Sequence, residues 1–226
     1  GRSQHRELIG RATLGPVVDE LGAEPIEALL FDLGGVVLEI DFGRCFRRWA
    51  DSAGCAADEI AALFEFDSAY EDHERGTLDT ADYWTNVRAA LSVDLPDDSL
   101  LAGWNDIWVD TDREVLDLLS LAGDRWPLYA FTNSNPAHQA VWATRFAGEL
   151  ESFDTVFVSS ELGHRKPDRA AFDAVVDRIG VPAPKVLFLD DGAENVAGAR
   201  STGLQAVQVT SAESVRSALR SAGLRC

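Results

Sequence analysis

Acidic residues follow two apolar runs of the chain, where they could hold a metal ion or attack a substrate. Asp32 comes directly after the run Ala28–Phe31, and the pair Asp190 and Asp191 comes after Val186–Leu189. Buried adjacent carboxylates repel each other, and a divalent cation is the usual remedy, with all-oxygen ligation favouring Mg²⁺. Each acid could instead cap a turn, but turn chemistry does not explain why acids end two different runs.

Groups that could bind an anion follow a third apolar run. Thr132 and Asn133 stand at its end, shortly before a predicted helix. A hydroxyl and the amides of such a turn can donate hydrogen bonds to a phosphoryl oxygen. The alternative is that this segment only begins a helix, which is sufficient for Asn135 and Pro136 but explains less about Thr132.

The chain contains only two lysines, Lys166 and Lys185. Lysine carries a compact point charge that fits between a carboxylate and a phosphate, whereas arginine demands a planar, two-pronged partner. We therefore expect Lys166, in the loop Gly163–Asp168, to lie between a carboxylate and a bound phosphate. Lys185 opens a predicted strand, and we expect it at a solvated edge.

The apolar runs alternate with helical patterns, which is typical of an α/β fold with a doubly wound, Rossmann-like parallel sheet. Helical spacing is clear, for example, in Phe172, Val175, Val176 and Ile179. In such sheets ligands bind at the carboxyl ends of the strands, where the candidate residues stand. The predicted strands are Ala28–Phe31, Trp126–Phe131, Thr155–Val158, Lys185–Leu189 and Gln205–Val209.

Residues 40–111, between the first two predicted strands, are too many for an ordinary crossover and predict a helical insertion. Apolar stripes at helical spacing indicate four helices in it. The stripes are Phe42, Cys45, Phe46 and Trp49; Ile60, Leu63 and Phe64; Tyr83, Trp84, Val87 and Leu91; and Leu101, Trp104, Ile107 and Trp108. The predicted division is an extension at 1–26, an α/β core at 27–39 and 112–226, and the insertion.

Composition restricts the partners. A formal charge of -18 argues against nucleic acid or an anionic membrane as the principal partner, so an anionic substrate needs a local cationic group. The three cysteines are an odd number without metal-ligand spacing, which predicts a reducing cytoplasm. No apolar run reaches the length of a membrane span. The oligomeric state has no signature in the sequence.

The order of the four segments resembles the haloacid dehalogenase-like (HAD) hydrolase superfamily, whose motifs are an Asp-led first strand, a Ser/Thr, a Lys and an acidic pair. The resemblance covers about residues 27–226. Three phrases, Phe31–Val37, Asp72–Gly76 and Arg165–Pro167, are similar to those of bacterial sugar-phosphate phosphatases of the α-D-glucose-1-phosphate phosphatase type. The resemblance implies a phosphatase that acts on a small phosphorylated metabolite, with a sugar phosphate as one candidate.

Roles for individual residues follow from the same resemblance. It implies that Asp32 attacks phosphorus to form an aspartyl-phosphate, that Lys166 stabilises charge on Asp32 and the phosphate, and that Thr132 and the Asn133 amide bind the phosphoryl group. The helical insertion would be a C1-type cap that closes over the site.

The implied cofactor is Mg²⁺. By the resemblance, its ligands are Asp32, the backbone carbonyl of Gly34 and Asp191, with Asp190 nearby in a supporting role. This arrangement would shield the attacking carboxylate from an anionic substrate.

One position departs from the family pattern, because most of its phosphatases carry a second Asp, a general acid and base, where this chain has Gly34. Loss of general acid–base catalysis typically costs about 10²- to 10⁴-fold in rate. The departure predicts a slow phosphatase, a good leaving group such as an anomeric phosphate, or a replacement acid from the insertion. His73 and Glu74 are the candidates for that acid, although a solvated helix end is the simpler role for both.

Two other functions remain open. A 2-haloacid dehalogenase would tolerate Gly34, because halide leaves without a proton, but Leu33–Val36 departs from the dehalogenase pattern. A catalytically silent phosphate-binding protein would keep the pocket without the chemistry. Retention of Asp32, Thr132, Lys166 and Asp191 together counts against it.

Overall fold

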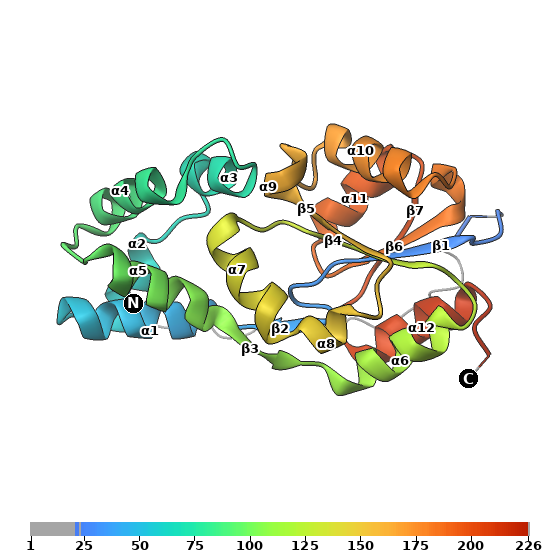
Figure 1. Cartoon of the computed structure of the whole chain (residues 1–226), viewed down its shortest axis with the longest axis horizontal. Helices are drawn as coiled ribbons and strands as arrows, with labels where there is room; N and C mark the ends of the chain where they lie inside the picture. Colours follow the sequence, from blue (N-terminus) through green and yellow to red (C-terminus); the bar gives the residue numbers. More distant parts are fainter. Residues whose placement is uncertain (1–20, 23, 226) are drawn as a thin grey trace, which may run out of the picture.

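The computed structural model describes residues 21–22 and 24–225, which form a parallel sheet flanked by helices, with a group of helices inserted after the first strand (Figure 1). The five strands are parallel, in the order β5-β4-β1-β6-β7. They are β1 Ala28–Phe31, β4 Leu128–Thr132, β5 Thr155–Val158, β6 Val186–Asp190 and β7 Gln205–Gln208. The predicted α/β class and all five predicted strands are confirmed, although β4 begins at Leu128 and not at Trp126. Most of the predicted extension at 1–26 lies outside the described residues.

Helices cover both faces of the sheet, as a doubly wound fold requires. Helices α6 (Arg113–Gly123) and α12 (Ala212–Ser221) lie on one face, and α10 (Arg169–Ile179) and α11 (Ala193–Ser201) lie on the other (Figure 1). Successive residues of β1 alternate between the faces: Leu29 belongs to the core under α6 and α12, and Leu30 to the core under α10 and α11. Both faces of β1 are buried, which explains its continuous apolar sequence.

The remaining elements of the α/β part lie beside or between these layers. They are α7 Pro136–Arg145, α8 Ala147–Leu150, α9 Ser159–Leu162 and the 3-10 turn η3 Ala183–Lys185. None of the described helices is long and apolar enough to span a membrane.

The insertion contains one more helix than its apolar stripes predict, and it is framed by two strands that were not predicted. Its elements are β2 Leu38–Ile40, α1 Phe42–Ala53, α2 Ala57–Leu63, α3 Ser68–Glu74, α4 Thr80–Leu91, α5 Asp97–Trp104, the 3-10 turn η2 Asn105–Ile107 and β3 Trp108–Thr111. β2 and β3 pair in antiparallel fashion where the chain leaves and re-enters the α/β part. The fourth predicted stripe is wrong at its ends, because Leu101 is exposed and Trp108 begins β3.

Residues 40–111 are called the cap below, although β2 begins two residues earlier, at Leu38. The cap is attached to the α/β part through the end of α3. The Glu74 carbonyl accepts a 2.7 Å hydrogen bond from Ser159 Oγ. Gly76 follows with φ of +72°, and a Cβ there would lie 2.5 Å from the Ser160 carbonyl oxygen. Only glycine fits this close approach, so the Gly76 position is explained by the contact between cap and core.

Two buried histidines lie where the cap meets α7. The ring of His138 stacks on Trp104 with a 4.6 Å centroid separation, and the ring of His73 stacks on Tyr83 at 4.4 Å. Burial lowers the pKa of His138 to about 3, with a smaller contribution from His73, and burial lowers the pKa of His73 to about 4. Both rings are therefore neutral at physiological pH.

This burial predicts a loss of stability on mild acidification. Below the usual histidine pKa of about 6.5, the unfolded chain binds a proton that folded His138 does not, so the free energy of unfolding falls as pH falls. Between pH 7 and pH 5, wild-type protein should lose about 2 kcal/mol more than His138→Phe, which keeps a ring on Trp104. Urea unfolding at both pH values measures the difference, and equal losses in the two proteins would contradict a neutral His138.

Candidate active site

The sheet brings the candidate residues together at the carboxyl ends of its three central strands. β1 lies between β4 and β6, and Phe31 pairs with Ala130 on one side and Leu189 on the other. Asp32 follows β1 directly, while Thr132 and Asp190 are the last residues of β4 and β6. The predicted convergence of these segments is therefore present in the fold.

Lys166 is buried at the centre of this edge, between two carboxylates. Its Nζ lies 2.9 Å from Asp32 Oδ1 and 2.7 Å from Asp190 Oδ2, and it donates to the Phe131 carbonyl at 2.9 Å. The side chain is 1% exposed, so its three donors are all used within the protein. Burial alone would lower the pKa of Lys166, but Asp190 and Asp32 outweigh it and hold the pKa above its usual value.

The two oxygens of Asp32 have different surroundings. Oδ1 accepts hydrogen bonds from the Leu33 backbone N–H at 2.7 Å and from Lys166 Nζ. Oδ2 has no hydrogen-bond partner among the described residues, and Asp32 lines a cavity. Burial raises the pKa of Asp32 well above its usual value; Lys166 opposes this shift, and Asp190 and Asp191 add to it. A cation beside Oδ2 would relieve the same repulsion.

Three carboxylates are close enough to share a cation: one oxygen each from Asp32, Asp190 and Asp191 lies within 4.8 Å of the others. Asp190 is already engaged, because Oδ1 accepts from Gly192 N–H at 2.7 Å and Oδ2 accepts from Lys166. Asp32 Oδ2 and the Asp191 carboxylate are thus the better placed ligands. An all-oxygen set of this kind fits Mg²⁺.

Gly35 makes room for the third carboxylate. Its φ is +81°, and a Cβ built on it would lie 2.4 Å from Asp191 Oδ2. With any other residue at position 35, the Asp191 carboxylate would have to move. The glycine at position 35 is therefore explained by Asp191, which directly follows β6, as well as by its own turn.

The side chain of Asn133 positions the lysine loop instead of facing a ligand. Its Oδ1 accepts from the Lys166 backbone N–H, and its Nδ2 donates to the Lys166 carbonyl, both at 2.9 Å. Only the backbone N–H of Asn133 is left for a phosphoryl group. Thr132 is 3% exposed and lines the cavity, beside Asp32 and Lys166.

The cavity between the strand ends and the cap has a volume of about 250 Å³, near the lower end of the range of roughly 300–1,000 Å³ for small-molecule sites. Of the two cap acids considered from the sequence, Glu74 lines it and His73 does not. Sequence reasoning missed several lining residues, because it assigned their aromatic stripes to the core or saw no signal in them. These are Ile40, Phe42, Phe66, Tyr70, Ile107, Trp108, His138, Arg165 and Asn195.

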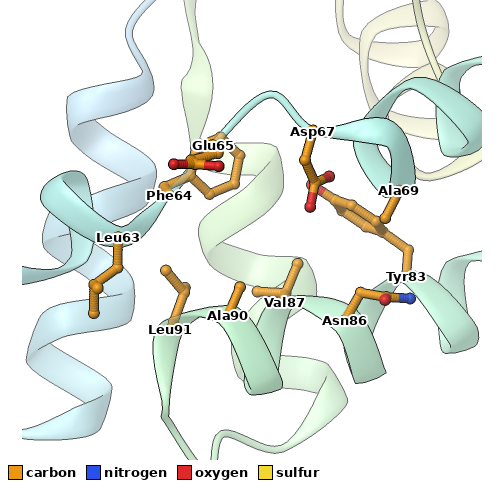
Figure 2. A pocket seen from close by; sticks show the side chains of 10 residues that line it. All are labelled: Leu63, Phe64, Glu65, Asp67, Ala69, Tyr83, Asn86, Val87, Ala90 and Leu91. Atoms are coloured by element: carbon orange, nitrogen blue, oxygen red, sulfur yellow. The ribbon is translucent and has the colours of Figure 1, made fainter.

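A smaller cavity of about 60 Å³ lies within the cap, between α4 and the segment that joins α2 to α3 (Figure 2). Leu63, Val87 and Leu91 line it, and Asp67 is occupied in capping α3 through its bond to the Tyr70 N–H. None of the candidate residues reaches it. The larger cavity is therefore the candidate active site.

The burial of Lys166 predicts that its removal is costly. Lys166→Met leaves the carboxylates of Asp32 and Asp190 buried without their cation, and should lower the free energy of unfolding by about 3–5 kcal/mol in metal-free buffer. Lys185→Met is the matched control: Lys185 pairs with exposed Glu27 at 2.6 Å, where solvent screens the charges, so stability should change little. Similar losses in both variants would contradict the central position of Lys166.

Comparisons with known proteins assign most of the chain to one family. Residues 26–203 match the family model described as haloacid dehalogenase-like hydrolase. A D-ribitol-5-phosphate phosphatase of Bacteroides thetaiotaomicron is 24% identical over 81% of this chain and 91% of its own length. A sesquiterpene phosphatase of Aspergillus oryzae is 26% identical over 81% and 90%.

Among solved structures, a HAD family enzyme from Bacteroides thetaiotaomicron, in complex with magnesium and inorganic phosphate, superposes with a TM-score of 0.69. Its sequence is 25% identical, and the match covers 81% of this chain and 93% of that one. The family model spans most of the sheet and the whole cap, including every candidate residue. The chain belongs to the haloacid dehalogenase-like hydrolases.

Proposed function

We propose that this hydrolase removes phosphate from a small phosphorylated metabolite by way of a phosphorylated Asp32, with Mg²⁺ as cofactor. The observation that carries the proposal is the asymmetry of Asp32, which lines the cavity. Its Oδ1 is fixed by Leu33 and Lys166, whereas its Oδ2 has no hydrogen-bond partner among the described residues. The relatives named as phosphatases support the same reaction class. The cysteine content favours the cytoplasm as its location.

The reaction would proceed in two displacements. Asp32 Oδ2 attacks phosphorus, the ester P–O bond breaks, and the alcohol oxygen departs with that electron pair and takes up a proton. Water then attacks the same phosphorus, inorganic phosphate leaves, and the Asp32 carboxylate is restored. Lys166 stays beside Asp32 throughout and stabilises negative charge on both the carboxylate and the transferred group.

The metal site proposed for this chain consists of Asp32, the backbone carbonyl of Gly34 and Asp191. A bound Mg²⁺ would neutralise the carboxylates and draw charge from the phosphoryl oxygens. Asp190 would act as a support, because its oxygens are held by Lys166, Gly192 and Asn195. The phosphoryl group would accept hydrogen bonds from Thr132 and from the Asn133 backbone N–H.

Delivery of a proton to the leaving alcohol is the weak point of this site. Glu74 lines the cavity and burial raises its pKa, but its Oε2 accepts a 2.8 Å bond from Arg165 Nε, which favours the ionised form. We therefore propose that Glu74 mainly holds the cap and that general acid catalysis is poor. The reaction should be slow for esters of ordinary alcohols.

The proposed reaction predicts phosphate release from a panel of sugar and aryl phosphates in the presence of Mg²⁺, and its loss in Asp32→Asn. Asp58→Asn, at an exposed position of α2, serves as the control and should keep full activity. A malachite green assay measures the phosphate. Chloride release from 2-chloropropionate without phosphate release would favour the dehalogenase, and saturable phosphate binding without turnover would favour the silent binding protein.

Restoring the missing acid should accelerate the reaction. A Cβ at Gly34 would meet only the Ile40 side chain, whose nearest atom, Cδ1, would lie at an ordinary 3.4 Å, so Gly34→Asp can be accommodated. We expect kcat for an alkyl phosphate to rise by about 10- to 100-fold, part of the 10²- to 10⁴-fold that a placed general acid contributes. For p-nitrophenyl phosphate, whose leaving group needs no proton, the change should be small. An unchanged kcat for the alkyl ester would mean that another group already supplies the proton.

A further inference from the structure

The part of the active-site cavity that the cap lines is mostly apolar, with Glu74 as its charged member. It is contributed by β2, α1, the segment after α2, α3, η2 and β3. Its apolar members form a wall of Ile40, Phe42, Phe66, Tyr70, Ile107 and Trp108. The phosphoryl end of a bound ester would lie at Asp32, so this wall is where the alcohol part of the substrate must lie.

Phe66 is the most unusual member of this wall. Its large apolar side chain is 58% exposed, and it lies in the irregular segment between α2 and α3. Its ring packs edge-on against Tyr70 at a 4.9 Å centroid separation and against Phe42 at 5.3 Å. An exposed aromatic ring over a cavity provides apolar surface that a ligand can cover.

The cations of the lining are already paired with the protein's own acids. Arg165 Nε lies 2.8 Å from Glu74 Oε2, and another of its nitrogens lies 3.1 Å from Glu71 Oε1. Lys166 is held between Asp32 and Asp190. A second negative charge on the substrate would therefore meet no unpaired cation among the described residues that line the cavity.

The side-chain amides of the lining are committed as well. Asn133 is bound at both side-chain atoms to the Lys166 backbone, and Asn195 donates to Asp190. The ring nitrogens Trp108 Nε1 and His138 Nε2 lack partners but are buried inside the protein. Hydroxyl groups of a polyol would thus lose their water without gaining equivalent partners, at a cost of about 10-fold in affinity for each one left unpaired.

We infer that the substrate is a monophosphate ester of an uncharged, predominantly apolar alcohol, and that Phe66 is a specificity-determining residue for it. The inference rests on the proposed phosphatase activity and deepens it. It departs from the sugar phosphate that the sequence offered as one candidate. The phosphoryl group would bind at Asp32 in every substrate, and the aromatic wall would determine which alcohol part is preferred.

Matched esters test the inference. With Mg²⁺ present, kcat/KM for n-hexyl phosphate should exceed that for methyl phosphate and for glycerol 3-phosphate by about 10-fold or more, because several methylene groups become buried. Fructose 1,6-bisphosphate should be the poorest substrate. Equal or higher kcat/KM for glycerol 3-phosphate or the bisphosphate would overturn the inference.

Phe66→Ala should lower the hexyl-to-methyl ratio of kcat/KM by about 3- to 10-fold, and Phe66→Leu should recover most of it. Leu63→Ala is the control, since Leu63 is 49% exposed in the same part of the cap but does not line this cavity; the ratio should stay within about twofold. An equal change of the ratio in Phe66→Ala and Leu63→Ala, or no change in Phe66→Ala, would contradict a role of Phe66 in substrate specificity.

A binding measurement separates failure of this inference from failure of the proposed function. Calorimetric titration of Asp32→Asn with hexyl phosphate and with glycerol 3-phosphate, in Mg²⁺, reports the preference for the alcohol without turnover. Tighter binding of hexyl phosphate, together with absent turnover in wild type, would contradict the proposed phosphatase activity but support the inferred preference for an apolar alcohol. Turnover in wild type, with no preference for hexyl phosphate in the kinetic or the binding measurement, would support the phosphatase activity and contradict the preference for an apolar alcohol.

Discussion

The buried ammonium of Lys166 is the interaction on which the rest of the site depends. A cation that is 1% exposed requires anionic partners, and here they are Asp32 and Asp190, at the ends of adjacent strands. The parallel order β4-β1-β6 brings those ends together, and Asn133 at the end of β4 holds the lysine loop by two hydrogen bonds to the Lys166 backbone. Three strands, one loop and one charge network therefore form a single unit. Removing the charge of Lys166, Asp32 or Asp190 would leave a buried charge without one of its partners.

The same loop connects this unit to the cap. Arg165 and Lys166 are consecutive, and while Lys166 reaches the strand ends, Arg165 pairs with Glu74 at the end of α3. Ser159 adds a second connection, since its Oγ lies 2.7 Å from the Glu74 carbonyl oxygen and accepts from the Ser134 N–H at 2.9 Å. The position of the cap is thereby coupled to the residues at the strand ends. A substrate whose alcohol part fills the aromatic wall would contact both parts of the protein at once.

Much of this arrangement follows from the sequence because strands and their ends are locally encoded. Five apolar runs predict the five parallel strands, and strand ends in a doubly wound sheet must share one edge, which places Asp32, Thr132 and Asp190 together. Contacts between distant segments carry no comparable local signal. The short pair β2 and β3 forms only when the two ends of the cap meet, and the exposure of Phe66 beside Phe42 and Tyr70 is evident only from the structure. The resemblance implied that the Asn133 amide binds the phosphoryl group, and only the position of Lys166 shows that the Asn133 side chain is engaged elsewhere.

Phosphorylation of Asp32 itself is the most direct measurement of the central claim. Wild-type protein and Mg²⁺ are mixed with a rapidly hydrolysed aryl phosphate, quenched in acid during turnover and digested, and the peptide that contains Asp32 is analysed by mass spectrometry. We expect a phosphoryl group on Asp32, sensitive to hydroxylamine as an acyl phosphate is. Steady release of phosphate with an unmodified Asp32, or with the phosphoryl group on another side chain, would contradict the account.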